Sequence, residues 1–217
     1  MRAARLALCL SAVLAGCLIV PPLAAGQPPE RGPRVGGVVS GSFGDGGPAP
    51  TVGISAGYRF TPRLGVEVDA SYMPGLDFGE FDICPPGVFC ALPVTAGLPV
   101  VGGTQSLHGR AALVSVNGVS EIPVRAHWLR PYVVGGVGVA EVRREQRYDS
   151  YPIRFTRTSV GPLLTAGGGV DFLVWRNVGI GVDLRYQHVF EKDQFGRSDM
   201  DHNLTVTRFG SSVSYRF

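Results

Sequence analysis

The chain has 217 residues, of which 45% are hydrophobic and 17% are charged, with 31 glycines and 17 prolines. This length allows one medium domain, and so little charge is unusual for a soluble helical protein. The formal net charge of +3 mostly disappears once a predicted export signal with two arginines is removed, so nucleic-acid binding has no compositional support.

Residues 1–26 are predicted to be a cleaved signal peptide. Arg2 and Arg5 form a basic start, residues 6–20 an apolar core, and residues 24–26 a small-residue cleavage site. After it, no uninterrupted apolar run reaches the roughly 18 residues of a spanning helix. A disordered periplasmic stub is expected over residues 27–33.

Two alternatives stay open for the signal. One is a retained amphipathic or spanning helix, which the short apolar core disfavours. The other is a lipoprotein signal, because residues 14–17 resemble the motif after which bacterial lipoproteins are cleaved and acylated at a cysteine, here Cys17. Residues 18–20 continue the apolar core where a lipoprotein usually turns polar, so cleavage after Gly26 is preferred.

The rest of the chain divides into eight strand-like segments. They cover residues 34–44, 51–60, 64–72, part of 106–124, 131–144, 163–174, 178–190 and 204–217. Short turns alternate with longer connections, which are predicted at residues 45–50, 73–104, 145–159 and 191–203.

Alternation gives these strands one apolar face and one face of glycine, serine and charge. In the segment 178–190, for example, Val182 and Leu184 share a face, and Asp183 and Arg185 share the other. In 131–144 the run of glycine and valine leaves the facing ambiguous. The shared parity of Glu141 and Arg143 predicts that both point inward.

The segment 204–217 is the most informative one. Val213, Tyr215 and Phe217 share its apolar face, and Arg208 and Arg216 share the polar one. This segment resembles the closing strand of bacterial outer-membrane β-barrels, a family that ends in an aromatic residue read by the assembly machinery. Val213, Tyr215 and Phe217 are the expected assembly signal, although Ser212 stands where the family pattern favours glycine.

The whole mature chain resembles small outer-membrane barrels of the OmpA and OmpX type. The resemblance implies an all-β fold, an eight-stranded antiparallel up-and-down transmembrane β-barrel over residues 34–217. It implies a place in the bacterial outer membrane, with both termini in the periplasm. The implied partners are outer-membrane lipid, lipopolysaccharide and the barrel-assembly machinery.

An eight-stranded barrel has an interior about filled by side chains. Its inward charges are predicted to form a charge-paired plug without a wide water channel. The predicted lumen network contains Arg59, Glu67, Asp69, Asp171, Asp183, Arg185, Arg208 and Arg216. Aromatic residues near the strand ends predict interfacial girdles. They are Tyr58, Phe60, Tyr72, Phe172, Trp175, Tyr186, Tyr215 and Phe217.

The connection 73–104 holds two further candidates. Cys84 and Cys90 flank a Pro-Pro-Gly turn and are predicted to form a disulfide, since they are the cysteines left in an oxidising compartment after removal of the signal. The loop is also unusually apolar, which indicates an interaction surface or a continuation of the neighbouring strands. Its candidate contact residues are Val88, Phe89, Leu92, Val94 and Leu98.

No pattern typical of an enzyme, a metal site or a cofactor site occurs in the sequence. There is no Gly-x-Ser-x-Gly elbow, the histidines lack ligand spacing, and the acidic residues at 199–203 lack the glycine and glutamate of a calcium loop. The preferred function is a non-enzymatic anchor with interacting surface loops. The alternatives are a narrow porin or hydrophobic-solute conduit, and a soluble lipocalin-like lipid-binding barrel with its apolar faces inside.

Overall fold

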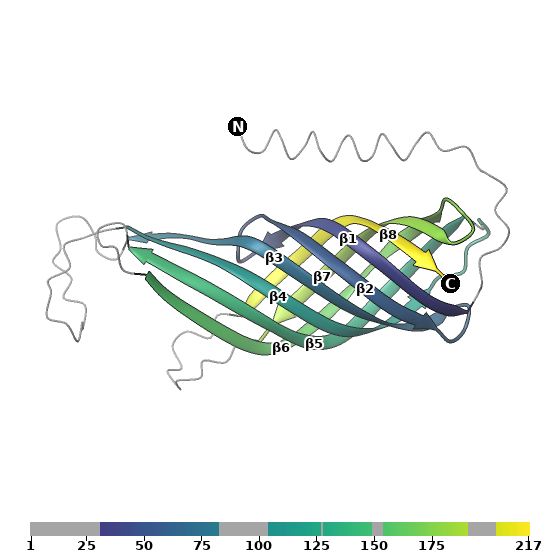
Figure 1. Cartoon of the computed structure of the whole chain (residues 1–217), viewed down its shortest axis with the longest axis horizontal. Coiled ribbons are helices and arrows are strands. Elements are labelled where there is room, and N and C mark those ends of the chain that lie inside the picture. Colours follow the sequence, from purple (N-terminus) through teal and green to yellow (C-terminus); the bar gives the residue numbers. More distant parts are fainter. Residues whose placement is uncertain (1–30, 83–103, 127, 149–153, 191–202) are drawn as a thin grey trace, which may run out of the picture.

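The computed structural model describes residues 31–82, 104–126, 128–148, 154–190 and 203–217. The strands are β1 (Gly32–Gly44), β2 (Ala49–Arg59), β3 (Leu64–Asp82), β4 (Thr104–Glu121), β5 (Leu129–Tyr148), β6 (Arg154–Leu173), β7 (Val178–Val189) and β8 (Leu204–Arg216). Each strand pairs antiparallel with the next, and β1 pairs with β8 to close the barrel (Figure 1). The predicted eight-stranded antiparallel barrel is confirmed. Among the described residues, no helix has the length and apolar composition needed to cross a membrane.

Four strands are longer than the sequence pattern predicts. Strands β3 to β6 have 18 to 20 residues, whereas the other four have 11 to 13. The predicted connections 73–104 and 145–159 are therefore too long, since β3 reaches Asp82 and only residues 149–153 separate β5 from β6. Charged residues are typical of loops, but here they continue the backbone pairing of β3 to β6. At the other end, β1 begins at Gly32, inside the predicted stub.

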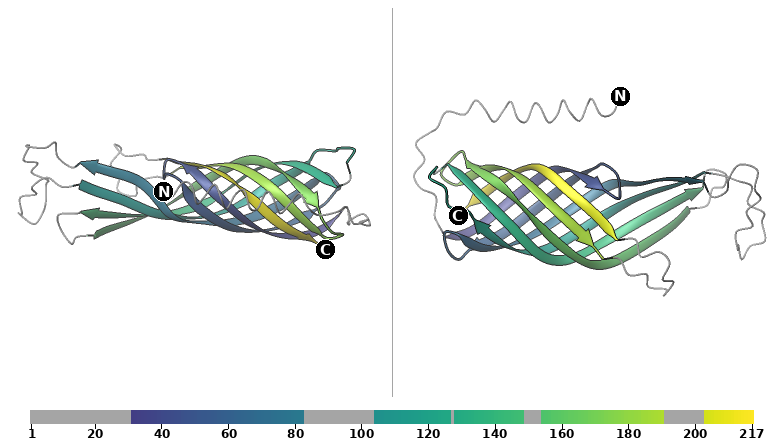
Figure 2. Two further views of the ribbon diagram at one scale, coloured as in Figure 1. Left: turned by 90° about the horizontal axis from the view of Figure 1, so that it is seen from above. Right: turned by 180° about the vertical axis from the view of Figure 1, so that it is seen from behind.

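The extra residues of β3 to β6 form a four-stranded sheet that continues past the ends of the other strands (Figure 2). We call this part the extended wall and define it as residues 74–82, 104–110, 143–148 and 154–158. It lies at the opposite end of the barrel from the start of β1 and the end of β8 (Figure 1). We call that opposite end the terminal end.

Strand β3 is irregular where the extended wall begins. Its register against β4 shifts between Pro74 and Leu76 and again between Asp77 and Glu80. Gly75 lies beside the first shift with a φ of 73°. That is a backbone conformation that suits glycine, and bulges of this kind bend a strand and increase its twist.

Large apolar side chains cover the outside of the barrel, and charged side chains lie inside it. On β2, Ile54 is 69% exposed and Arg59 only 7%; on β7, Leu184 is 50% exposed and Asp183 only 1%. This arrangement is the reverse of the lipocalin-like alternative, which is therefore wrong. It is the arrangement expected when the outer face contacts lipid rather than water.

The predicted inward facing of Glu141 and Arg143 is wrong. Both side chains are exposed, whereas Val142 between them is fully buried. The reason is that β5 pairs with β4 without a bulge, so every second residue from Tyr132 to Val142 points inward. Glu141 and Arg143 occupy the alternate positions, which point outward. Glycine and valine fit either face, so the local sequence carries no sign of this parity.

Candidate functional site

Side chains of four kinds fill the barrel interior in successive layers. From the terminal end upward they are a mouth cluster, a central network, a hydroxyl and amide layer, and an apolar layer. The mouth cluster contains Arg34, Arg59, Glu121, Arg130, Asp171 and Arg216, and the central network contains Glu67, Asp69, Asp183, Arg185 and Arg208. Most of the side chains in these layers are buried.

The central network connects three strands. Arg185 Nη2 on β7 donates to Glu67 Oε1 on β3 at 2.7 Å, and Arg185 Nε donates to both Asp183 carboxylate oxygens at 3.0 Å. On β8, Arg208 bridges Asp69 and Asp183, each at 3.3 Å. Three carboxylates thus share two guanidinium groups, and charge-assisted hydrogen bonds of this kind are the strong ones.

Tyr132 and two glycines complete the central network. The Tyr132 hydroxyl donates to Asp183 Oδ2 at 2.9 Å. A Cβ on Gly169 would lie 2.6 Å from the Tyr132 hydroxyl oxygen, and a Cβ on Gly167 would lie 3.2 Å from Arg185 Cγ. The inward glycines of β6 therefore provide the space in which these long side chains cross the lumen.

The mouth cluster has four arginines for two carboxylates. Asp171 Oδ2 accepts from Arg34 at 2.9 Å and from Arg216 at 3.2 Å. Glu121 Oε1 lies 3.0 Å from Arg59 Nη2 and 3.3 Å from Arg216 Nη2. Its other oxygen lies 3.5 Å from Arg130. The cluster therefore carries an excess of two positive charges.

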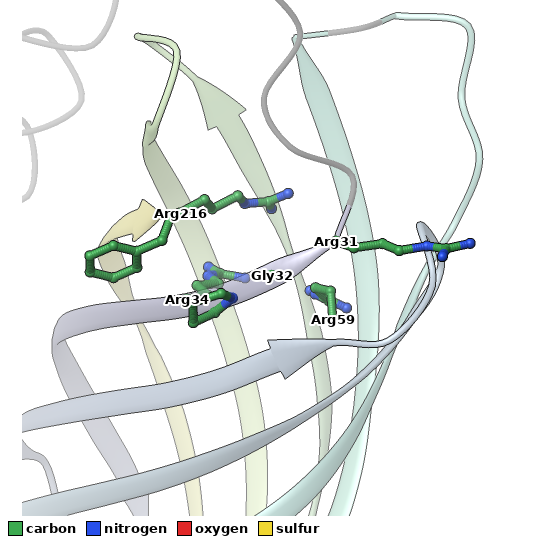
Figure 3. A pocket seen from close by; sticks show the side chains of 7 residues that line it. Arg31, Gly32, Arg34, Arg59 and Arg216 are labelled. Atoms are coloured by element: carbon green, nitrogen blue, oxygen red, sulfur yellow. The ribbon is translucent and has the colours of Figure 1, made fainter.

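A small pocket opens at this end of the barrel beside Phe217, and Figure 3 shows the arginines that line it. Arg34 Nε, Arg59 Nη1 and Arg216 Nε are buried there, and none of them has a hydrogen-bond partner among the described residues. Positive charge in a narrow opening attracts anions. The terminal end of the lumen is thus more favourable for anions than for cations.

Above the central network the interior becomes uncharged. A polar layer of Ser42, Thr51, Ser71, Ser115, Asn117, Thr165 and Gln187 is followed by an apolar one. The apolar layer packs Ala49, Met73, Leu76, Ala111, Leu113, Ala140, Val142, Leu163, Val189, Leu204 and Val206 against one another, with Phe78 at its side. It reaches into the base of the extended wall through Leu76 and Phe78, and the sequence analysis does not predict it.

The structure places all eight residues of the predicted lumen network inside the barrel and brings them into ion pairs. Arg59 pairs with Glu121 and not with one of the four predicted carboxylates. Sequence reasoning missed Glu121, Arg34, Arg130 and Tyr132. Arg34 could have been found, because it lies on the same face of β1 as the polar Ser40 and Ser42. The inward facing of Glu121 depends on the register of β4, which the sequence leaves open.

The other predicted site residues fall into two groups. Val213, Tyr215 and Phe217 are exposed on the outer face, where the Tyr215 and Phe217 rings lie 4.9 Å apart. All eight predicted girdle aromatics are exposed as well. Outside the described residues lie both cysteines of the predicted disulfide and the candidate contact residues of the loop. These are Cys84, Cys90, Val88, Phe89, Leu92, Val94 and Leu98.

Within the described residues, no group of three or more His, Cys, Asp or Glu side chains could hold a metal ion. The charged side chains of the interior form ion pairs with one another. Their shared property is that each carboxylate contacts at least one guanidinium group.

Comparison with known proteins gives one family match. The family model described as "Outer membrane protein beta-barrel domain" matches residues 10–217. A search of curated proteins finds no match.

Similar solved structures are barrels with low sequence identity. A major outer membrane protein from Thermus thermophilus is 16% identical, with a TM-score of 0.54 over 85% of this chain and 99% of that one. Neisserial surface protein A is 14% identical, with a TM-score of 0.47 over 87% and 97%. The attachment invasion locus protein Ail of Yersinia pestis is 14% identical, with a TM-score of 0.47 over 86% and 97%. At such identities the likeness concerns the fold alone.

Proposed function

Since the chain belongs to the outer membrane protein beta-barrel domain family, we propose that it is a non-enzymatic anchor of the bacterial outer membrane. The apolar outer face holds the barrel in the bilayer, and the extended wall stands outside the cell. In this orientation the terminal end faces the periplasm, as it does when short turns lie on the periplasmic side and longer connections on the extracellular side.

The observation that carries this proposal is the contact of buried side chains across the lumen. Arg185, which is 3% exposed, reaches Glu67 across the lumen. Above this pair the apolar layer brings Leu113 and Leu163, 2% and 1% exposed, into one cluster. An ion crossing the barrel would have to break the charge pairs and then lose its water in the apolar layer, which costs several kcal/mol.

Ion conductance tests this proposal. The refolded parent protein is inserted into a planar lipid bilayer beside Asp183→Ala and Arg185→Ala, each of which opens the central network. A silent parent supports the anchor, and leaking variants would show that the network contributes to closure. Steady conductance from the parent would instead make the protein a narrow porin, with anion preference expected from the mouth cluster.

A further inference from the structure

The extended wall contains arginines that stand directly opposite one another on neighbouring strands. The pairs are Arg110 with Arg143 across β4 and β5, and Arg144 with Arg157 and Arg147 with Arg154 across β5 and β6. Like charges in directly opposed positions destabilise a sheet. Such pairs are favourable only where nearby negative charge compensates for them.

Two of these pairs find local compensation. Arg154 lies 3.5 Å from Glu145, and Arg144 stacks over the Phe78 ring at 4.8 Å. Arg110 and Arg143 are exposed on the outer face, and among the described residues neither side chain has an ion pair or a hydrogen bond. Within the described part of the chain, this pair therefore has unused donors on the outside of the wall.

The position of Arg110 and Arg143 along the barrel indicates what they could contact. They lie next to the apolar outer face of the barrel, which we call the apolar belt. Residues that pair across neighbouring strands form a row around the barrel. The outward-facing row directly below the arginine pair consists of Tyr72, Ala112, Glu141 and Val160. One row further is two residues, or about 7 Å along the strands. The headgroup region occupies about the first 5–8 Å beyond the hydrocarbon core on each side of the bilayer. With Tyr72 and Val160 at the edge of the core, the arginine pair therefore lies among the headgroups.

We propose that Arg110 and Arg143 together bind the phosphate group of an outer-leaflet lipid. Guanidinium groups match phosphate oxygens in a two-pronged geometry that lysine does not offer. Glu141 is exposed one row below the two arginines. Its negative charge offsets one of their two positive charges, so an excess of one positive charge is left for a ligand. The proposal rests on the proposed function, because it needs the belt to be surrounded by lipid and the wall to stand above it.

A lipid fits better than a soluble polyanion because of where the two side chains point. They leave the outer face of the barrel beside the apolar belt, where a bilayer would present its headgroups. Arg147 and Arg154 lie two rows further from the belt, and the Glu145 contact of Arg154 reduces the positive charge available there to a soluble ligand.

Lipid retention tests the proposal. The parent is placed in phosphatidylcholine nanodiscs that contain either phosphatidic acid or the matched phosphate-free diacylglycerol, and the lipids that stay bound on transfer to detergent are counted by native mass spectrometry. Arg110→Gln/Arg143→Gln is compared with Arg125→Gln/Arg176→Gln, which removes the same charge from exposed turns at the terminal end.

We expect the parent and the control to retain phosphatidic acid over diacylglycerol. The Arg110→Gln/Arg143→Gln variant should lose about tenfold or more of this preference, since each basic residue at a membrane surface contributes substantially to anionic lipid binding. Arg110→Lys/Arg143→Lys should keep part of it. Because both side chains are exposed, the folded state of each variant can be verified by its heat-dependent gel mobility.

Equal retention by parent and Arg110→Gln/Arg143→Gln would overturn the proposal. So would a parent that prefers soluble glycerol phosphate in detergent but shows no phosphatidic acid preference in nanodiscs. Conductance of the same preparations reports separately on the proposed function. A conducting parent would reject the anchor while the lipid counts still decide the role of the arginine pair.

Discussion

Arg185 on β7 and Glu67 on β3 form an ion pair across the barrel, with Arg185 Nη2 lying 2.7 Å from Glu67 Oε1. Strands β3 and β7 are not neighbours in the sheet, so this contact joins opposite walls. Both side chains are at most 8% exposed. Neither charge can therefore exchange its partner for bulk water, which makes the pair a sensitive point for stability.

Breaking this pair on one side should destabilise the barrel strongly. Arg185→Met leaves the buried Glu67 carboxylate without its ion-pair partner, which typically costs about 3–5 kcal/mol. Glu67→Gln should cost less, because Arg185 keeps its ion pairs with Asp183 and Asp69. The double variant Glu67→Gln/Arg185→Met should cost less than the two single changes added together. Urea unfolding in lipid vesicles measures these free energies, with Arg176→Met at an exposed turn as the control. Single variants as stable as this control would contradict the structure.

The apolar layer should contribute to stability like the core of a soluble domain. Leu163→Ala removes a side chain that is only 1% exposed, and the resulting cavity should lower the free energy of unfolding by about 2–5 kcal/mol. Leu164→Ala, whose side chain faces outward on the same strand, should cost less because lipid can fill the space. Equal losses in vesicle unfolding would mean that no packed layer lies inside.

Two glycines of the sheet should respond differently to an added methyl group. A Cβ on Gly167 would lie 2.2 Å from the Leu184 carbonyl oxygen, whereas a Cβ on Gly118 would find its nearest neighbour, the Gly135 carbonyl oxygen, at 3.7 Å. Gly167→Ala should therefore cost about 1–3 kcal/mol through overpacking, and Gly118→Ala should be tolerated. Folding yield and urea midpoint check this, and a tolerated Gly167→Ala would contradict the close approach of β6 and β7.

The depth of the outer face in the bilayer can be tested with introduced charge. Val137 is 62% exposed in the middle of the apolar face of β5, and Val137→Arg should cost about 2–4 kcal/mol in vesicles, as expected near the midplane. Thr156→Arg on the extended wall lies outside the membrane in the proposed orientation and should be nearly neutral. A similar cost at both sites would place the two residues at the same depth, against the proposed orientation.

The amino-acid sequence was sufficient to predict the barrel and most of its interior charges. Alternation of apolar and polar residues is a local signal with a period of two, and it is strong around Asp183 and Arg185 on β7. The same signal fails for Glu141 and Arg143, because neighbouring glycines and valines are compatible with either face. It fails at Glu121 because the register of β4 could not be read from a continuous apolar run.

The sequence by itself determined that the chain forms eight strands, each with one apolar and one polar face, since these follow from periodicity and from the number of segments. Only the tertiary structure decided that Glu121 serves three arginines, that an apolar layer lies above the charges, and that β3 to β6 continue as a wall. These features depend on strand register and barrel closure. Both are set by contacts between residues far apart in the chain, and no local pattern encodes them.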